Sequence, residues 1–138
     1  MNILITGATG FIGGFIVDEA LRHEMDVWVA VRNSSSRKYL TDSRINFICL
    51  DLSCEKQLKQ QLAGKDFDYV VHAAGVTKCL QKEDFFRVNT EGTISLVNAI
   101  RSIGMPLKRF IYVSSLSVFG PIREQMPYKE IKETDTPH

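Results

Sequence analysis

Short apolar runs alternate along the chain with segments whose apolar residues recur at helical spacing. The apolar runs predict five strands, at residues 2–6, 27–31, 46–50, 68–73 and 109–113. Helices are predicted over 11–21, from the Ser34–Ser36 cluster to Leu40, after a cap at Ser53, and over 83–103 before Gly104 and Pro106. Because the strands are almost continuously apolar and alternate with helices, we predict an α/β fold whose parallel sheet is covered on both faces.

The composition is that of an ordinary globular domain, and it narrows the range of partners. Apolar residues make up 44% of the 138 residues, and 17 basic against 16 acidic side chains leave a net charge of +1. Nucleic acid is therefore not expected as a partner, since phosphate backbones select a clear basic excess. The sequence has no 18-residue apolar run and does not open like a signal peptide, so we expect neither a membrane span nor secretion.

The cysteines bear on the compartment and on metal binding. Cys49, Cys54 and Cys79 are odd in number and contain no CxxC pair. This pattern disfavours a disulfide framework and a metal site, and it favours the reducing cytoplasm.

The segment TGATGFIG, residues 6–13, joins the first predicted strand to the first predicted helix. Gly7 permits a tight turn, Gly10 lets a phosphate approach the backbone, and Gly13 lets the helix lie close to the sheet. Free amide groups and the positive end of the helix dipole would then bind a pyrophosphate. A glycine triplet is weak evidence by itself and strong evidence between a strand and a helix. The predicted dinucleotide contacts in this segment are Gly7, Thr9, Gly10, Phe11, Ile12 and Gly13.

Four motifs, taken in order, resemble the extended short-chain dehydrogenase/reductases, which include the nucleotide-sugar epimerases and dehydratases. They are the glycine segment, VVHAAG at 70–75, NTEGT at 89–93 and FIYVSSLSVFG at 110–120. The resemblance covers nearly the whole chain. It implies a doubly wound, Rossmann-type sheet with strand order 3-2-1-4-5, a nicotinamide dinucleotide as cofactor, and hydride transfer as the chemistry.

The residue at the end of the second strand bears on the choice of dinucleotide. Arg32 stands where NAD-binding relatives tend to carry an acid, and its planar guanidinium suits the 2′-phosphate of NADP. We therefore expect NADP, with NAD as the alternative if Arg32 only stacks on adenine or lies in solvent. Further contributions to this pocket are expected from Ser34, Ser35, Arg37 and Lys38. Asp51 and Leu52 resemble a family pair that contacts adenine, although Asp51 is equally suited to a simple loop cap.

Small residues follow the fourth strand and let its backbone approach a cofactor ribose. Ala73, Ala74 and Gly75 have the required size, and the resemblance places them in the site. The preceding His72 is expected to be a packed side chain rather than an acid or base. Asn89 resembles the family asparagine that supports the site from the long helix.

The hydroxyl cluster after the fifth strand contains the candidate catalytic residue. By resemblance this is Ser115, three residues before Val118, which would hold a substrate hydroxyl or carbonyl beside the nicotinamide. The family adds a Tyr-x-x-x-Lys pair on a following helix, where the lysine lowers the pKa of the tyrosine. Tyr128 and Lys132 match that spacing. They come too soon after Ser115, in a charged stretch without a helical apolar face, so we expect them to be a decoy.

These patterns divide the chain into a dinucleotide-binding domain over 1–120 and a loop over 121–138. We expect the loop to lead to a catalytic helix and a substrate lobe that this chain lacks. A long helix without its usual neighbour would leave an apolar strip uncovered and favour a homodimer. That strip consists of Val88, Leu96, Ile100 and Ile103.

Three functional hypotheses remain open. The first is the NADP(H)-binding portion of an oxidoreductase, epimerase or dehydratase that acts on a small-molecule substrate. The second is a non-catalytic dinucleotide-binding sensor or partner module. The third is a shortened enzyme in which Tyr128 and Lys132 are active.

Overall fold

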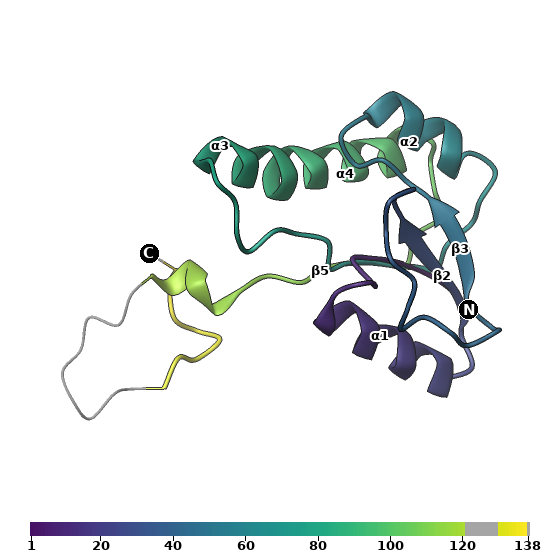
Figure 1. Ribbon diagram of the computed structural model, residues 1–138, viewed down its shortest axis with the longest axis horizontal. Helices are drawn as coiled ribbons and strands as arrows, with labels where there is room; N and C mark the ends of the chain where they lie inside the picture. The colour runs from purple at the N-terminus through teal and green to yellow at the C-terminus, as the bar shows by residue number, and fades with distance from the viewer. Residues whose placement is uncertain (121–129, 138) are drawn as a thin grey trace.

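The computed structural model describes residues 1–120 and 130–137, and its centre is a five-stranded parallel sheet (Figure 1). The strands are β1 (Asn2–Thr6), β2 (Asp26–Val31), β3 (Asn46–Cys49), β4 (Tyr69–His72) and β5 (Arg109–Tyr112). They lie in the order β3-β2-β1-β4-β5, and every neighbouring pair is parallel. The doubly wound, Rossmann-type fold and the strand order expected from the sequence are therefore confirmed.

Helices cover both faces of the sheet (Figure 1). The helical segments are α1 (Phe11–Arg22), α2 (Glu55–Leu62), α3 (Lys82–Phe85), a π-helical segment (Phe86–Glu91), α4 (Gly92–Ser102) and a 3₁₀ helix (Leu116–Phe119). Apolar residues of α1 pack with β1 and β2 on one face, and those of α2 and α4 pack with β1 and β4 on the other. The long helix predicted over 83–103 is thus present, as α3, the π-helical segment and α4 in direct succession.

The helix α1 buries its second half and ends in a motif that satisfies its last carbonyl groups. Val17, Ala20 and Leu21 are buried, whereas the first-turn Phe11 points to solvent. After the helix, Glu24 adopts a positive φ of 53°, and the amide of Met25 donates to the carbonyl of Ala20 at 3.1 Å. This is the Schellman arrangement, which usually places glycine at the position that Glu24 occupies.

The same arrangement ends α4, here with the glycine that the sequence predicted. Gly104 has a φ of 63°, and the amide of Met105 donates to the carbonyl of Ile100. The expectation of an uncovered apolar strip on this helix is wrong. Leu96 and Ile100 are buried against Leu58 and Leu62 of α2 and against the sheet, because α2 packs directly on α4. The strip therefore does not support self-association.

Two further local predictions were wrong. Residues 33–40, all of which are described, form turns and not a short helix, since the Ser35 hydroxyl accepts a hydrogen bond from the Arg32 amide and closes a turn there. Ser53 does not cap α2. The residue before that helix is Cys54, and the hydroxyl of Ser53 instead donates to the Asp51 carboxylate at 2.6 Å.

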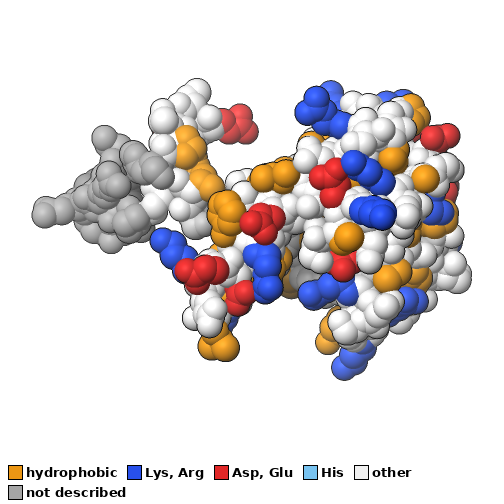
Figure 2. Space-filling view, turned by 90° about the horizontal axis from the view of Figure 1, so that it is seen from above, with side chains coloured by type: hydrophobic (Ala, Val, Ile, Leu, Met, Phe, Trp, Pro, Cys, Tyr) orange, Lys and Arg blue, Asp and Glu red, His pale blue; other side chains and the backbone are white. Residues whose placement is uncertain are grey.

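The chain beyond β5 leaves the sheet and runs outward through the 3₁₀ helix (Figure 1). Residues 130–137 contain a turn, in which the Asp135 amide donates to the carbonyl of Lys132. Among the helices of the described ranges, none has the length and apolarity needed to cross a membrane. On the face shown in Figure 2, basic and acidic side chains are interspersed and do not form a basic patch.

Candidate functional site at the carboxyl edge of the sheet

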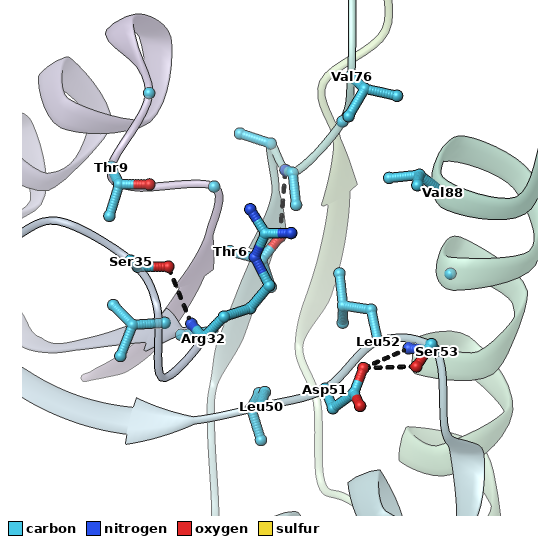
Figure 3. Close-up of a pocket in the computed structure, with 18 of the residues that line it drawn as sticks. Thr6, Thr9, Arg32, Ser35, Leu50, Asp51, Leu52, Ser53, Val76 and Val88 are labelled. Atoms are coloured by element: carbon cyan, nitrogen blue, oxygen red, sulfur yellow. Dashed lines mark hydrogen bonds between the residues drawn. The ribbon is translucent and has the colours of Figure 1, made fainter. Parts of the chain in front are cut away.

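A cavity of about 440 Å³ lies where the carboxyl ends of β1, β2 and β4 meet the start of α1 (Figure 3). Its walls come from five segments that are far apart in the sequence. They are Thr6–Gly10 without Ala8, Ala30–Arg32 with Ser35, Leu50–Ser53, Ala73–Val76, and Arg87, Val88 and Gly92 of the long helix. A crevice beyond the carboxyl ends of parallel strands, where the strand order reverses, is the place at which open α/β sheets bind ligands.

The three glycines of the turn before α1 have different tasks. A Cβ on Gly7 would lie 2.5 Å from backbone atoms of Ala73, and one on Gly13 would overlap the carbonyl of Gly7. Gly7 and Gly13 are therefore required by the fold itself. A Cβ on Gly10 would lie 3.3 Å from the Gly7 carbonyl, which a small shift relieves. Since Gly10 also lines the cavity, the space beside it is available to a ligand.

The amino terminus of α1 is arranged to receive an anion. Its first-turn amides, on Phe11, Ile12 and Gly13, have no partners within the helix, and the Gly10 position supplies no side-chain cap. No acidic residue stands in the first turn to occupy the positive end of the dipole. Phe11 and Ile12 are 83% and 55% exposed, and neither they nor Gly13 are among the residues that line the cavity.

Arg32 extends from the end of β2 into the cavity. In Figure 3, Thr9 and Ser35 lie on one side of it, and Leu52 and Ser53 lie on the other. Ser35, which the sequence suggested for this pocket, is among the residues that line the cavity. Of the other residues expected there, Arg37 lies over the Phe47 ring at 4.5 Å and Lys38 over the Tyr39 ring at 5.5 Å, and neither they nor Ser34 line the cavity.

Asp51 lines the cavity and also closes its own loop, so both of its predicted roles are compatible with the structure. Its Oδ1 accepts hydrogen bonds from the Ser53 amide at 2.9 Å and the Ser53 hydroxyl at 2.6 Å. The hydroxyl bond, followed by the amide bond and the charge of Arg32, lowers the pKa of Asp51. The carboxylate is consequently anionic at neutral pH. Leu52 lines the wall beside it.

The segment after β4, which includes Ala73, Ala74 and Gly75, forms one wall of the cavity. Asn89 does not itself line the cavity. Its side-chain oxygen accepts from the Val76 amide at 2.8 Å, and its side-chain amide donates to the Val76 carbonyl at 3.0 Å. Asn89 therefore supports this wall from behind. His72 is fully buried between Thr6 and Thr93, and burial lowers its pKa, in keeping with a packed side chain.

Sequence reasoning missed Arg87 and Val88 as cavity residues. Val88 was assigned to the core face because a period of 3.6 residues relates it to Leu96. The π-helical segment Phe86–Glu91 changes that period and turns Val88 and Arg87 toward the cavity. Arg87 also pairs with Asp84 at 2.6 Å on the surface.

The structure does not bring Ser115 to the cavity. Its hydroxyl precedes the 3₁₀ helix and accepts hydrogen bonds from the Ser117 amide at 3.2 Å and the Ser117 hydroxyl at 2.9 Å. Tyr128 lies outside the described residues. Lys132 is exposed and begins the turn to Asp135, which places it in no helix. Within the described ranges, no three His, Cys, Asp or Glu side chains gather where they could hold a metal ion.

A family model described as the NAD dependent epimerase/dehydratase family matches residues 3–138. The chain belongs to this family. Its parallel sheet is thus the NAD-binding Rossmann fold of the NAD dependent epimerases and dehydratases. The chain is 30% identical over 141 residues to a UDP-glucose 4-epimerase of Klebsiella pneumoniae, covering 94% of this chain and 99% of that sequence. It is 32% identical to the ceramide reductase of Caulobacter vibrioides, covering 86% of this chain and 36% of that protein.

Solved structures of the epimerase/dehydratase family have the same fold. A UDP-glucose-4-epimerase from Stenotrophomonas maltophila, with bound NAD and formylated UDP-arabinopyranose, superposes with a TM-score of 0.81 at 23% identity. The match covers all of this chain and 43% of that one. Apart from the Klebsiella sequence, the chain therefore spans less than half the length of these relatives.

Proposed function

We propose that this chain binds NADP(H) in the edge cavity and forms the cofactor-binding portion of an oxidoreductase, epimerase or dehydratase. The complete protein would transfer hydride at a carbinol or carbonyl carbon of a small molecule. The observation that carries the proposal is the combination of a helix terminus without a side-chain cap, the α1 amides beside Gly10, with an arginine and not an acid at position 32. Family membership supports the dinucleotide, and Arg32 supports the phosphorylated form.

The glycine turn fits a pyrophosphate without rearrangement. Gly10 has no side chain that would block the approach, and the amides of Phe11, Ile12 and Gly13 supply donors together with the positive end of the helix dipole. Thr9 stands on the same wall and offers a hydroxyl. These groups would hold the diphosphate bridge, whereas Ala73, Ala74 and Gly75 allow a ribose to approach the β4 wall.

Arg32 and Asp51 favour different dinucleotides. The guanidinium of Arg32 can donate two parallel hydrogen bonds to a 2′-phosphate, and its own backbone amide is already held by Ser35. The Asp51 carboxylate could accept from a free 2′-hydroxyl, as in NAD, through Oδ2 while Oδ1 accepts from Ser53, but it would repel a 2′-phosphate less strongly than the paired guanidinium of Arg32 attracts it. We therefore favour NADP, and we keep NAD as the alternative that the NAD-bound Stenotrophomonas epimerase represents.

The bound nicotinamide supplies or accepts the hydride, and the protein positions the reactants. Ser115 would hold the substrate oxygen. Its hydroxyl hydrogen can turn toward a substrate oxygen, because Ser115 is the acceptor in its bond to the Ser117 amide. Because Lys132 lies in a turn and not on a helix, we expect this chain to bind dinucleotide without turnover.

Calorimetric titration with NADPH and NADH tests the proposal. We expect NADPH to bind more tightly, and we expect Arg32→Ala to weaken NADPH about tenfold or more while NADH changes by less than about twofold. Arg101→Ala, which removes an exposed arginine of α4 away from the cavity, is the charge-matched control. Tighter binding of NADH to the unaltered protein would overturn the assignment of NADP. Gly10→Ala should fold normally and weaken both dinucleotides.

A non-catalytic dinucleotide-binding module is the second candidate function. The position of Ser115 favours it, because this hydroxyl contacts Ser117 and lies outside the cavity-lining residues that the structure describes. The substitution Ser115→Ala, made in the complete natural protein, distinguishes the two functions. Loss of hydride transfer with unchanged dinucleotide affinity supports the enzyme, and unchanged behaviour in every assay supports the module.

A further inference from the structure

A continuous line of hydrogen bonds crosses the protein behind the β4 wall of the cavity. The Thr6 hydroxyl lies 2.6 Å from Nδ1 of His72, and Nε2 of His72 lies 2.9 Å from the Thr93 hydroxyl. The Thr93 hydroxyl in turn lies 2.7 Å from the backbone carbonyl of Asn89. At the other end, the backbone amide of Ala74 reaches the Thr6 hydroxyl at 3.3 Å (Figure 3).

The ends of this line determine the direction of every bond in it. The Asn89 carbonyl can only accept, so the Thr93 hydroxyl must donate its single hydrogen there. Thr93 can then only accept from His72, which places the ring proton on Nε2 and leaves Nδ1 as an acceptor. The Thr6 hydroxyl donates to Nδ1 and accepts from the amide of Ala74. The neutral imidazole with hydrogen on Nε2 is the form that satisfies all four bonds.

Both ends of the line act on the same short segment. Thr6 holds its beginning at Ala74, and Asn89 holds its end through two hydrogen bonds to Val76. The segment has no helix or strand of its own, and Ala73–Val76 all line the cavity. Thr93 lies outside the cavity lining, two hydrogen bonds from Thr6, and its bond to the Asn89 carbonyl fixes the helix that carries Asn89.

We infer that Thr93 and His72 are positioning residues of the dinucleotide site, which hold the segment 73–76 at the distance from the glycine turn that the ligand requires. The inference rests on the proposed dinucleotide-binding function and goes beyond it by assigning affinity to buried groups that do not touch the ligand. Without the line, Ala74 and Val76 would be held from one side only. Ligand binding would then have to order the segment 73–76, and the free energy of this ordering would reduce the affinity.

Thr93→Val provides the test, because it keeps the shape of the side chain and removes the hydroxyl. Titrations with NADPH and NADH at about pH 8, where His72 is neutral, should show dinucleotide affinity reduced about tenfold. Thr93→Ser restores the hydroxyl and should stay within about twofold of the unaltered protein. Thr90→Val makes the same exchange at an exposed position of the π-helical segment directly before α4 and should change nothing. Circular dichroism melts establish that each variant is folded at the titration temperature.

A spectroscopic signature tests the direction of the bonds separately from affinity. Long-range ¹H–¹⁵N correlation spectra of the His72 ring should show hydrogen on Nε2 and none on Nδ1, with or without dinucleotide. Hydrogen on Nδ1 would overturn the inference, since Thr6 could no longer donate to the ring.

The remaining outcomes separate this inference from the function on which it rests. If the unaltered protein binds neither dinucleotide, the proposed function fails and the inference fails with it. If the unaltered protein binds and Thr93→Val binds equally well, the proposed function survives and the inference alone is wrong. A lower melting temperature for Thr93→Val with unchanged affinity would likewise assign the line to stability and overturn the inference.

Discussion

Two adjacent glycines in the first turns of α1 should respond in opposite ways to the same substitution. Alanine is about 1 kcal/mol more favourable than glycine inside a helix, and this gain applies to Gly14→Ala, whose new Cβ would lie 3.8 Å from the Ala8 carbonyl in ordinary contact. At Gly13 the new Cβ would overlap the Gly7 carbonyl and lie 2.7 Å from the Ala8 Cα. These are backbone atoms and cannot rotate away.

The magnitudes follow from these contacts. Overpacking against backbone costs about 3 kcal/mol, so Gly13→Ala should lose about 2 kcal/mol after its helix gain is subtracted. Gly14→Ala should gain about 1 kcal/mol. For a chain of this size, about 4 °C accompanies each kcal/mol, which predicts a melting temperature about 8 °C lower for Gly13→Ala and about 4 °C higher for Gly14→Ala.

Thermal melts followed by far-ultraviolet circular dichroism, supported by guanidinium titrations, measure both variants against the unaltered protein. Gly14→Ala is the matched control, because it makes the same chemical change one residue away on the same helix. The reasoning is refuted if Gly13→Ala melts at or above the unaltered protein. It is also refuted if the two substitutions shift the melting temperature in the same direction by similar amounts.

Two further predictions concern stability. Glu24→Gly should raise the free energy of unfolding by about 0.5–1 kcal/mol, because Glu24 has a φ of 53°, at which glycine is unstrained. Gly104→Ala, at a φ of 63°, should lower the free energy of unfolding by a similar amount. Thermal melts in which the two variants do not shift in opposite directions would contradict this reasoning. Burial lowers the pKa of His72 from 6.5, so the unfolded chain binds the proton first as the pH falls. The contribution of His72 to stability should be fully present above about pH 6.5 and decline below it, which thermal melts at about pH 8 and about pH 5.5 measure. The control variant His23→Gln, at an exposed site, should show the same decline. A stability that does not change between the two pH values would count against a buried His72.

The sheet could be predicted from the sequence because its strands are nearly continuous apolar runs. Burial of both faces requires that pattern, and glycine before α1 and after α4 marks where the chain must turn. The family resemblance suggested Arg32 and Ala73 as site residues, and the fold brings both to the cavity because the carboxyl ends of parallel strands share one edge. The order of the strands came from the family resemblance and not from the pattern.

Local hydrogen bonds account for most of what the sequence could not predict. The serines at 34–36 suit a helix cap and a turn equally, and the bond from the Arg32 amide to Ser35 selects the turn. Ser53 was expected to serve α2 and serves Asp51 instead. The π-helical segment has no signal in the apolar pattern, so a period of 3.6 residues misplaced Val88. The line from Thr6 to Asn89 depends on contacts between residues 66 and 21 positions apart, which no local pattern reveals.

Every described residue that lines the cavity lies between Thr6 and Gly92, before the last strand of the sheet begins. The part of the molecule that we propose as the dinucleotide site is therefore separate in sequence from everything after β5. Such a division would let proteins that share the residues of this cavity differ in the segment that follows β5. It offers a physical reason why a ceramide reductase and a UDP-glucose 4-epimerase both match this one stretch of chain.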